Sequence, residues 1–224
     1  FLHFYKLLSS EVPSVCRVAD VRRIFALELR KTRQIFPLDL LQNFTFAGGI
    51  TSIGEYAFSG SDAPVPTLHV EPGCVISGGA FERNVNVTFE TVDMSRLSSI
   101  GERAFCGCTG LCGRLDLSSA EHVGRSAFSD CTGITGFLDL AGVRSIGYYA
   151  FSNSSITGVR TSAALESFEQ GAFSGCRALE TAEIDGTNIG ISETFDHCAS
   201  LRSVTFGDGV VSMAGRGYST EIWG

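Results

Sequence analysis

Several features that mark common classes of protein are scarce or missing in this sequence. Charged residues occupy only 18% of the 224 positions, while 44% are hydrophobic, which argues against an intrinsically disordered chain. Only five prolines are present, so long proline-rich linkers are excluded. No apolar run reaches the roughly 18 residues that a membrane-spanning helix requires, and no secretory signal is visible.

Motifs of the common catalytic classes are also missing. The sequence contains no Walker-type phosphate loop, no G-x-S-x-G turn, no H-E-x-x-H zinc motif and no dinucleotide-binding fingerprint. The four histidines, His3, His69, His122 and His197, share no common position that would gather them into a site. We therefore expect neither enzymatic activity nor a cofactor.

The residues that are abundant indicate repetition instead. Seventeen phenylalanines stand against one tryptophan, and SIGEYAF at 52–58 recurs as SIGERAF at 99–105 and SIGYYAF at 145–151. With looser copies included, the terminal aromatic residue recurs every 22 to 24 positions, at Phe58, Phe81, Phe105, Phe128, Phe151, Phe173, Phe195 and Tyr218. This regularity predicts a tandem array of about eight units.

Each unit also contains a short run of apolar, polar and apolar residues, which begins 13 or 14 positions before the aromatic residue. These runs lie at 44–46, 68–70, 92–94, 115–117, 138–140, 159–161, 182–184 and 204–206. The alternation predicts one short strand per unit, and stacked units would form a parallel sheet with strands about 4.8 Å apart. Glycines that follow the next apolar residue, such as Gly54 and Gly124, are expected to permit a sharp turn.

These units resemble the BspA-like class of leucine-rich repeats. The family's unit is similar to L-x-x-V-x-I-P-x-x-V-x-x-I-G-x-x-A-F-x-x-C, and the resemblance covers about residues 41–220. It implies an α/β-type repeat solenoid, a right-handed coil with a short-stranded parallel β-sheet on its concave face. It also implies a non-enzymatic binding scaffold, typical of bacterial and protist surface proteins. The unit that ends at Phe81 departs from the pattern because it lacks the I-G pair, and the last unit ends in Tyr218.

The N-terminal segment differs from the array in charge. We expect two parts, a segment at 1–40 and a solenoid at 41–224. Residues 1–43 carry seven basic and four acidic side chains, a balance of +3, so the total of −7 leaves −10 for the remainder. An acidic array disfavours nucleic acid as a partner. We expect the segment to cap the open end of the solenoid, and a docking role toward a partner is the alternative.

Three cysteines lie close together in a C-x-C-x3-C pattern, at Cys106, Cys108 and Cys112. The position of Cys108, three residues after the aromatic, is also occupied by Cys131, Cys176 and Cys198. A zinc site would need a fourth ligand that the sequence does not offer. Neighbouring units bring such cysteines within reach of a disulfide, but parallel side chains rarely offer the required torsion. We expect free thiols and no metal.

The middle residues of the alternating runs are candidates for a binding surface. On the concave face they would form an exposed column of Thr45, His69, Asp93, Asp116, Asp139, Arg160, Glu183 and Thr205. Its carboxylates would repel and raise one another's pKa unless a basic partner or, less favoured, a calcium ion relieved them. Arg114 and Phe137 point to the same side, and an exposed Phe137 would anchor a partner. The alternative is that these side chains only solvate the strands.

Two functional hypotheses remain open. The first is a surface or secreted adhesion-type module that binds a protein partner, with a basic surface suiting the acidic column. The second is a structural subunit of a larger intracellular or organellar assembly, and an enzyme is the weakest alternative. Sequons at Asn43, Asn86 and Asn153 favour a secretory route, whereas unpaired cysteines favour a reducing compartment. A surface or secreted location is weakly favoured.

Overall fold

The computed structural model describes residues 49–61, 65, 67–190, 192–208, 210 and 212–214. The expectations for the segment 1–40, for the run at 44–46 and for Tyr218 lie outside this part of the chain. In the described part, no helix is long and apolar enough to cross a membrane.

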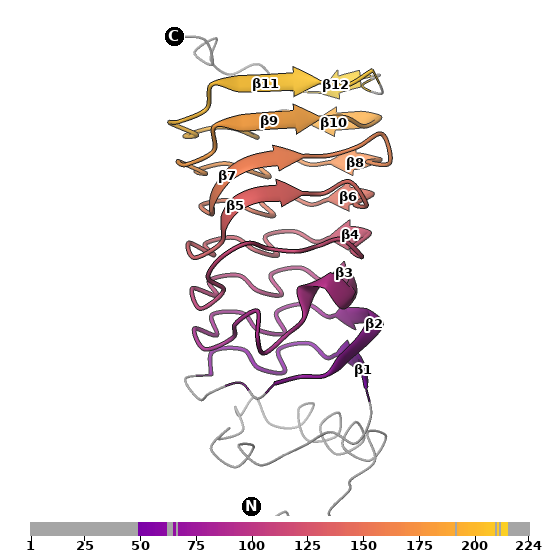
Figure 1. The fold of residues 1–224 in the computed structure, drawn as a ribbon, viewed down its shortest axis with the longest axis vertical. Helices are drawn as coiled ribbons and strands as arrows, with labels where there is room; N and C mark the ends of the chain where they lie inside the picture. The colour runs from indigo at the N-terminus through magenta and orange to yellow at the C-terminus, as the bar shows by residue number, and fades with distance from the viewer. Residues whose placement is uncertain are drawn as a thin grey trace, which may run out of the picture.

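The described chain winds into a stack of similar turns, which Figure 1 shows as a ladder with two columns of strands. One column is an eight-stranded parallel sheet in the order β1-β2-β3-β4-β6-β8-β10-β12, and the other is a four-stranded parallel sheet in the order β11-β9-β7-β5. The eight strands are β1 (Ile50–Ile53), β2 (Val70–Ile76), β3 (Leu97–Ile100), β4 (His122–Val123), β6 (Ser145–Ile146), β8 (Ser167–Phe168), β10 (Asn188–Gly190) and β12 (Ser212–Ala214). The four strands are β5 (Thr135–Asp139), β7 (Ser155–Arg160), β9 (Thr181–Ile184) and β11 (Ser203–Phe206). The predicted parallel solenoid is therefore confirmed.

A continuous column of phenylalanine rings forms the centre of the core. Ring centroids of successive residues from Phe58 to Phe173 lie 5.0 to 5.5 Å apart with interplanar angles of 4 to 5°. The last step, to Phe195, is 6.3 Å. Five of these rings, those of Phe81, Phe105, Phe128, Phe151 and Phe173, have no exposed surface. The repeated aromatic position is thus the packing contact between neighbouring turns.

The backbone beside each phenylalanine adopts the left-handed conformation twice. Positions two before and two after the ring have positive φ in all seven described turns, as at Tyr149 (φ 55°) and Asn153 (φ 58°) around Phe151. This geometry directs alternate N–H groups toward the next turn, where Phe151 donates to the carbonyl of Ala172 at 2.8 Å. These cross-turn hydrogen bonds offset the cost of left-handed residues other than glycine.

The glycines of the I-G pairs play a different part from the one expected. Gly101, Gly124 and Gly147 do not have the positive φ that would explain a sharp turn. A Cβ added at Gly124 would instead lie 2.7 Å from the carbonyl carbon of Gly101 in the preceding turn. The expectation of a sharp turn was wrong. Glycine is needed here because only a residue without a side chain lets the two backbones approach so closely.

Among the described residues, the alternating runs that form the predicted strands are those of the C-terminal half of the array, as β5, β7, β9 and β11. At 68–70 and 92–94 the two runs share an isolated bridge between Leu68 and Val92. Asp93 caps a 3-10 helix, η2 (Met94–Arg96), while Asp116 lies in irregular backbone. Burial still alternates there, with Leu115 and Leu117 buried around exposed Asp116. The apolar-polar-apolar alternation therefore indicates which side chains face the core. It does not show that the backbone forms a continuous hydrogen-bonded sheet.

The cysteine column ties four of the described turns to the turn before each of them. The thiol of Cys108 donates to the carbonyl of Phe81 at 2.9 Å, and that of Cys131 donates to Phe105 at 3.0 Å. Cys176 and Cys198 make the same bond at 3.2 Å, and Asn84 replaces it with an amide bond to Phe58 at 2.8 Å. Burial raises the pKa of Cys131 and of Cys198 to about 12. These thiols are thus neutral hydrogen-bond donors at physiological pH.

Thiol reactivity should separate this column from the exposed Cys112. Alkylation needs an accessible thiolate, and burial withholds both access and ionisation from Cys131 and Cys198. At pH 8 we expect iodoacetamide to label Cys112 at least roughly tenfold faster than either column thiol. Peptide mass spectrometry over a time course measures the rates. Equal labelling rates in the folded protein would contradict the described burial.

Candidate functional site

Three members of the predicted column lie side by side on the four-stranded sheet. In the register of the strands, Asp139 of β5 pairs with Arg160 of β7, which in turn pairs with Glu183 of β9. Asp139 is half-buried, and the other two side chains are exposed. The C-terminal half of the array therefore presents a row of charged side chains on one sheet face.

Phe137 of β5 lies against Gly158 of the neighbouring strand β7, its partner in the register of the sheet. Its ring fills the space where a side chain of Gly158 would stand, because a Cβ built there would be 2.7 Å from the ring atom Cδ2. The guanidinium carbon of Arg160 lies 5.9 Å from the centre of the same ring, within the range of a cation–π contact. Phe137 is half-buried and not fully exposed as predicted, since Gly158 lets it settle onto the sheet.

Asp139 fixes the position of Arg160 above that ring. The two side chains form an ion pair, and Asp139 also accepts the backbone N–H of Ala141 at 3.1 Å. The hydrogen bond from Arg160 is the main cause that holds the pKa of Asp139 below its usual value. We name Phe137, Gly158, Arg160 and Asp139 together the Phe137 platform.

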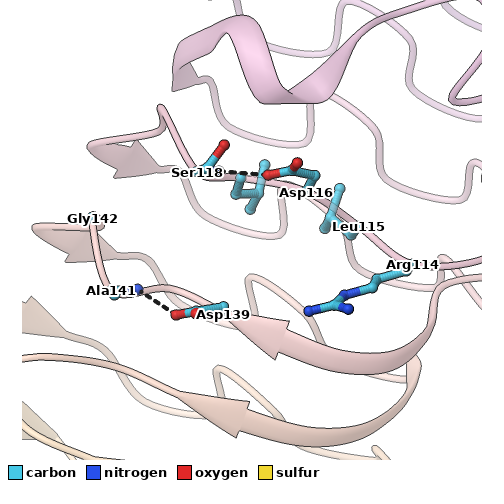
Figure 2. A pocket seen from close by; sticks show the side chains of 8 residues that line it. Arg114, Leu115, Asp116, Ser118, Asp139, Ala141 and Gly142 are labelled. Atoms are coloured by element: carbon cyan, nitrogen blue, oxygen red, sulfur yellow. Dashed lines mark hydrogen bonds between the residues drawn. The ribbon is translucent and has the colours of Figure 1, made fainter.

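A hollow of about 470 Å³ adjoins the Phe137 platform on its N-terminal side. It lies between the segment 114–118 of one turn and Asp139, Ala141 and Gly142 of the next. Figure 2 shows the side chain of Arg114 reaching into this gap, with Asp116 on one wall and Asp139 on the other. The hollow thus exposes both signs of charge and shares Asp139 with the Phe137 platform.

The aspartates of the column also have a structural task that the sequence analysis missed. Asp116 accepts the backbone N–H of Ser118 at 2.9 Å, as Asp139 does from Ala141, so each closes a turn after its strand position. Asp93 accepts from Ser95 and pairs with Arg96, and the Ser95 hydroxyl is the main cause that lowers the pKa of Asp93. The expected mutual rise in pKa is wrong for Asp93 and Asp139, because hydrogen-bond donors stabilise both carboxylates.

Two predicted residues are not joined to this surface. His69 lies before β2 and Asp93 caps η2, in the turns where the four-stranded sheet has not begun. Gly158, by contrast, was not predicted, although an isolated glycine in a strand pattern is a recognised sign of close approach by a neighbour. The surface that the structure assembles comprises Arg114, Asp116, Phe137, Asp139, Arg160 and Glu183.

The cysteine cluster does not form a metal centre in the described part of the chain. Cys108 points to the carbonyl of Phe81, while the exposed Cys112 contacts the carbonyl of Thr109 at 3.4 Å. Within the described residues no group of three or more histidine, cysteine, aspartate or glutamate side chains is placed to hold an ion. Cys106, Cys108, Cys112, Cys131, Cys176 and Cys198 are free thiols.

Comparisons with known proteins report a solved structure and a family to which this chain is similar. A leucine-rich repeat protein from Bacteroides ovatus is similar in structure, with 22% sequence identity and a TM-score of 0.43. The match covers 77% of this chain and 53% of that protein, so this chain spans about half of its length. No curated protein matches the chain. The model of the BspA type leucine-rich repeat region matches six copies, over residues 33–136 and 114–219, and the chain therefore belongs to the BspA-type leucine-rich repeat family.

Proposed function

We propose that this chain is a non-catalytic scaffold that binds a protein partner through the exposed face of the four-stranded sheet, around the Phe137 platform. Its family is one of repeat scaffolds that commonly serve protein interaction and are typically non-catalytic. The single observation that carries the proposal is the half-buried aromatic ring of Phe137, which packs against Gly158 and lies within cation–π distance of Arg160.

The Phe137 platform has the properties of an interface anchor. Aromatic residues are enriched at interfaces and arginine at their hot spots, where burial against a partner contributes most of the affinity. Gly158 and Asp139 already hold the ring and the guanidinium in place, so binding would lose little side-chain entropy. The neighbouring polar hollow would supply the hydrated rim of such an interface.

The charges that are left over favour a partner with basic groups. Asp139 is neutralised by Arg160, while Asp116 and Glu183 form no ion pair within the described residues. Both are exposed, Asp116 on the turn before the Phe137 platform and Glu183 on the turn after it. Complementary charge would speed the encounter and select the partner more than it would tighten the complex.

Replacing Phe137 by alanine should weaken partner capture at least tenfold while the array stays folded, because the anchor is lost from a half-buried surface position. Proteins that co-purify with the native chain are identified first, and their affinity for wild type and variant is then measured by biolayer interferometry. Tyr148→Ala, which removes an aromatic side chain that is 45% exposed elsewhere, is the matched control.

Three results decide between the alternatives. Capture that survives Phe137→Ala but is lost in Tyr148→Ala would move the interface to another face and refute the proposal. A Glu183→Lys variant should bind the partner more weakly than wild type if the partner is basic. It should bind more tightly if the partner is acidic. A partner that is chemically altered on incubation with the chain would contradict the non-catalytic role.

A further inference from the structure

Two exposed carboxylates lie on opposite sides of the Phe137 platform along the stack. Asp116 belongs to the turn before Asp139 of β5, and Glu183 of β9 is the register partner of Arg160 of β7. Arg160 forms its ion pair with Asp139, on the side away from Glu183. Within the described residues, neither Asp116 nor Glu183 forms an ion pair.

The aromatic ring lies about midway between these two carboxylates. Ring centroids in the core of the same turns lie 5.3 to 5.5 Å apart. Asp116 and Glu183 are separated by three such steps, so they stand about 15 Å apart along the stack. Phe137 extends from β5 against Gly158 of β7, which are the two middle turns. A carboxylate therefore lies about 7 Å from the ring in each direction along the stack.

An extended peptide carries side chains at this same spacing. Its residues rise about 3.4 Å each and point alternately to opposite sides, so every second side chain faces the same way about 7 Å further on. Such a segment, lying along the stack, places two basic side chains on the carboxylates and an apolar one over the ring. An α-helix rises only about 1.5 Å per residue and needs about ten residues to span the same distance.

Arg114 favours the extended form over the helix. Its side chain reaches into the hollow beside Asp116, as Figure 2 shows, and it forms no ion pair within the described residues. A guanidinium carries only donors and needs acceptor oxygens. The carbonyl groups of an extended segment are free to accept from it, whereas most of those in a helix are bonded within the helix.

We propose that the sheet face binds an extended segment of the partner in which a basic, an apolar and a second basic residue stand at every second position. The basic side chains pair with Asp116 and Glu183. Phe137 precedes Asp139 by two residues in its strand, so the apolar side chain must be long enough to lean onto the ring, as leucine is. This inference rests on the proposed function and specifies the chemistry of the partner.

A nuclear magnetic resonance titration of the isotope-labelled full chain with two synthetic peptides tests the spacing. The first is acetyl-Ser-Lys-Ser-Leu-Ser-Lys-Ser-amide. The second, acetyl-Ser-Lys-Leu-Ser-Ser-Lys-Ser-amide, has the same composition, but its leucine is moved by one position and turns to the other side of an extended chain. We expect the first peptide to bind about fivefold more tightly, because only its leucine reaches the ring. Its binding should shift the amide signals of β5, β7 and β9.

Removing each charge with little change of shape tests the two ends of the segment. Asp116→Asn keeps the side-chain oxygen that accepts the N–H of Ser118, and Glu183→Gln alters an exposed side chain, so both variants should stay folded. Each should weaken binding of the first peptide about threefold, and the double variant about tenfold. Glu121→Gln is the control and should change nothing, because this exposed charge lies beside β4 in the other sheet.

Three results would overturn the inference. Equal affinity of the two peptides excludes the spacing, and so does the failure of both to bind. Binding of the first peptide that is unchanged in the double variant excludes the pairing with the two carboxylates. Capture of the native partner is a separate measurement. If any of these results occurs while capture still depends on Phe137, the inference fails and the proposed function stands. Capture that does not depend on Phe137 refutes the proposed function itself.

Discussion

Replacing Phe128 by alanine is expected to lower the free energy of unfolding by about 4 kcal/mol. The ring is fully buried and stacks between those of Phe105 at 5.3 Å and Phe151 at 5.5 Å. Its loss removes the burial of a large side chain and two aromatic contacts, and it leaves a cavity that the rigid turns on either side cannot close. Urea unfolding followed by circular dichroism measures the change.

The matched control for this change is Tyr148→Ala, which should alter stability by less than about 0.5 kcal/mol because Tyr148 is an exposed residue outside the ring column. In a stack where each turn contacts only its neighbours, the damage should also be local. Hydrogen exchange should rise most in the turns of Phe105, Phe128 and Phe151. A uniform rise along the whole array would contradict this nearest-neighbour picture.

Adding a single methyl group at Gly124 is expected to cost about 2 kcal/mol of the free energy of unfolding. The new Cβ would stand 2.7 Å from the carbonyl carbon of Gly101 and 2.8 Å from the nitrogen of Glu102. Both contacts are to backbone atoms, which cannot rotate away as the end of a side chain could. The turn must therefore move apart from its predecessor and strain the cross-turn hydrogen bonds.

The same substitution at Gly54 provides an unusually close control. Gly54 occupies the equivalent position of its unit, yet a Cβ there would meet no atom of the described residues within 4 Å. Gly54→Ala should be neutral, or stabilising by up to about 1 kcal/mol through the unfolded chain. Thermal unfolding of the two variants measures the difference. Equal effects at the two positions would show that backbone conformation, and not close approach, requires glycine.

The repeat architecture was predictable because its main packing contact has a strong signature in the sequence. The Phe position must be filled by a similar ring in every turn if the rings are to stack, so the period is visible in the sequence. The eight-stranded sheet was missed because strands such as β4 and β6 are only two residues long. Alternation cannot be recognised over two residues.

The candidate site was predicted only in part. Burial alternation correctly placed Asp116 outward and Leu115 inward, but it could not reveal that Asp116 closes a turn. That task depends on the backbone N–H of Ser118, whose direction follows from three-dimensional structure. The ring of Phe137 settled against Gly158 because two strands distant in sequence lie in register. Patterns within one unit do not contain such cross-turn information.

The thiol-to-carbonyl bonds between turns have a consequence for how the gene can change. Cys108 and Cys131 make the same bond in successive turns, and removing residues 106–128 would place Cys131 three positions after Phe105, where Cys108 now stands. Cys131 would then face the carbonyl of Phe81, the present acceptor of Cys108. Unequal recombination between repeats could therefore remove or add whole units of the coding sequence. The hydrogen bond from a thiol to the carbonyl of the preceding turn would be kept at such a junction.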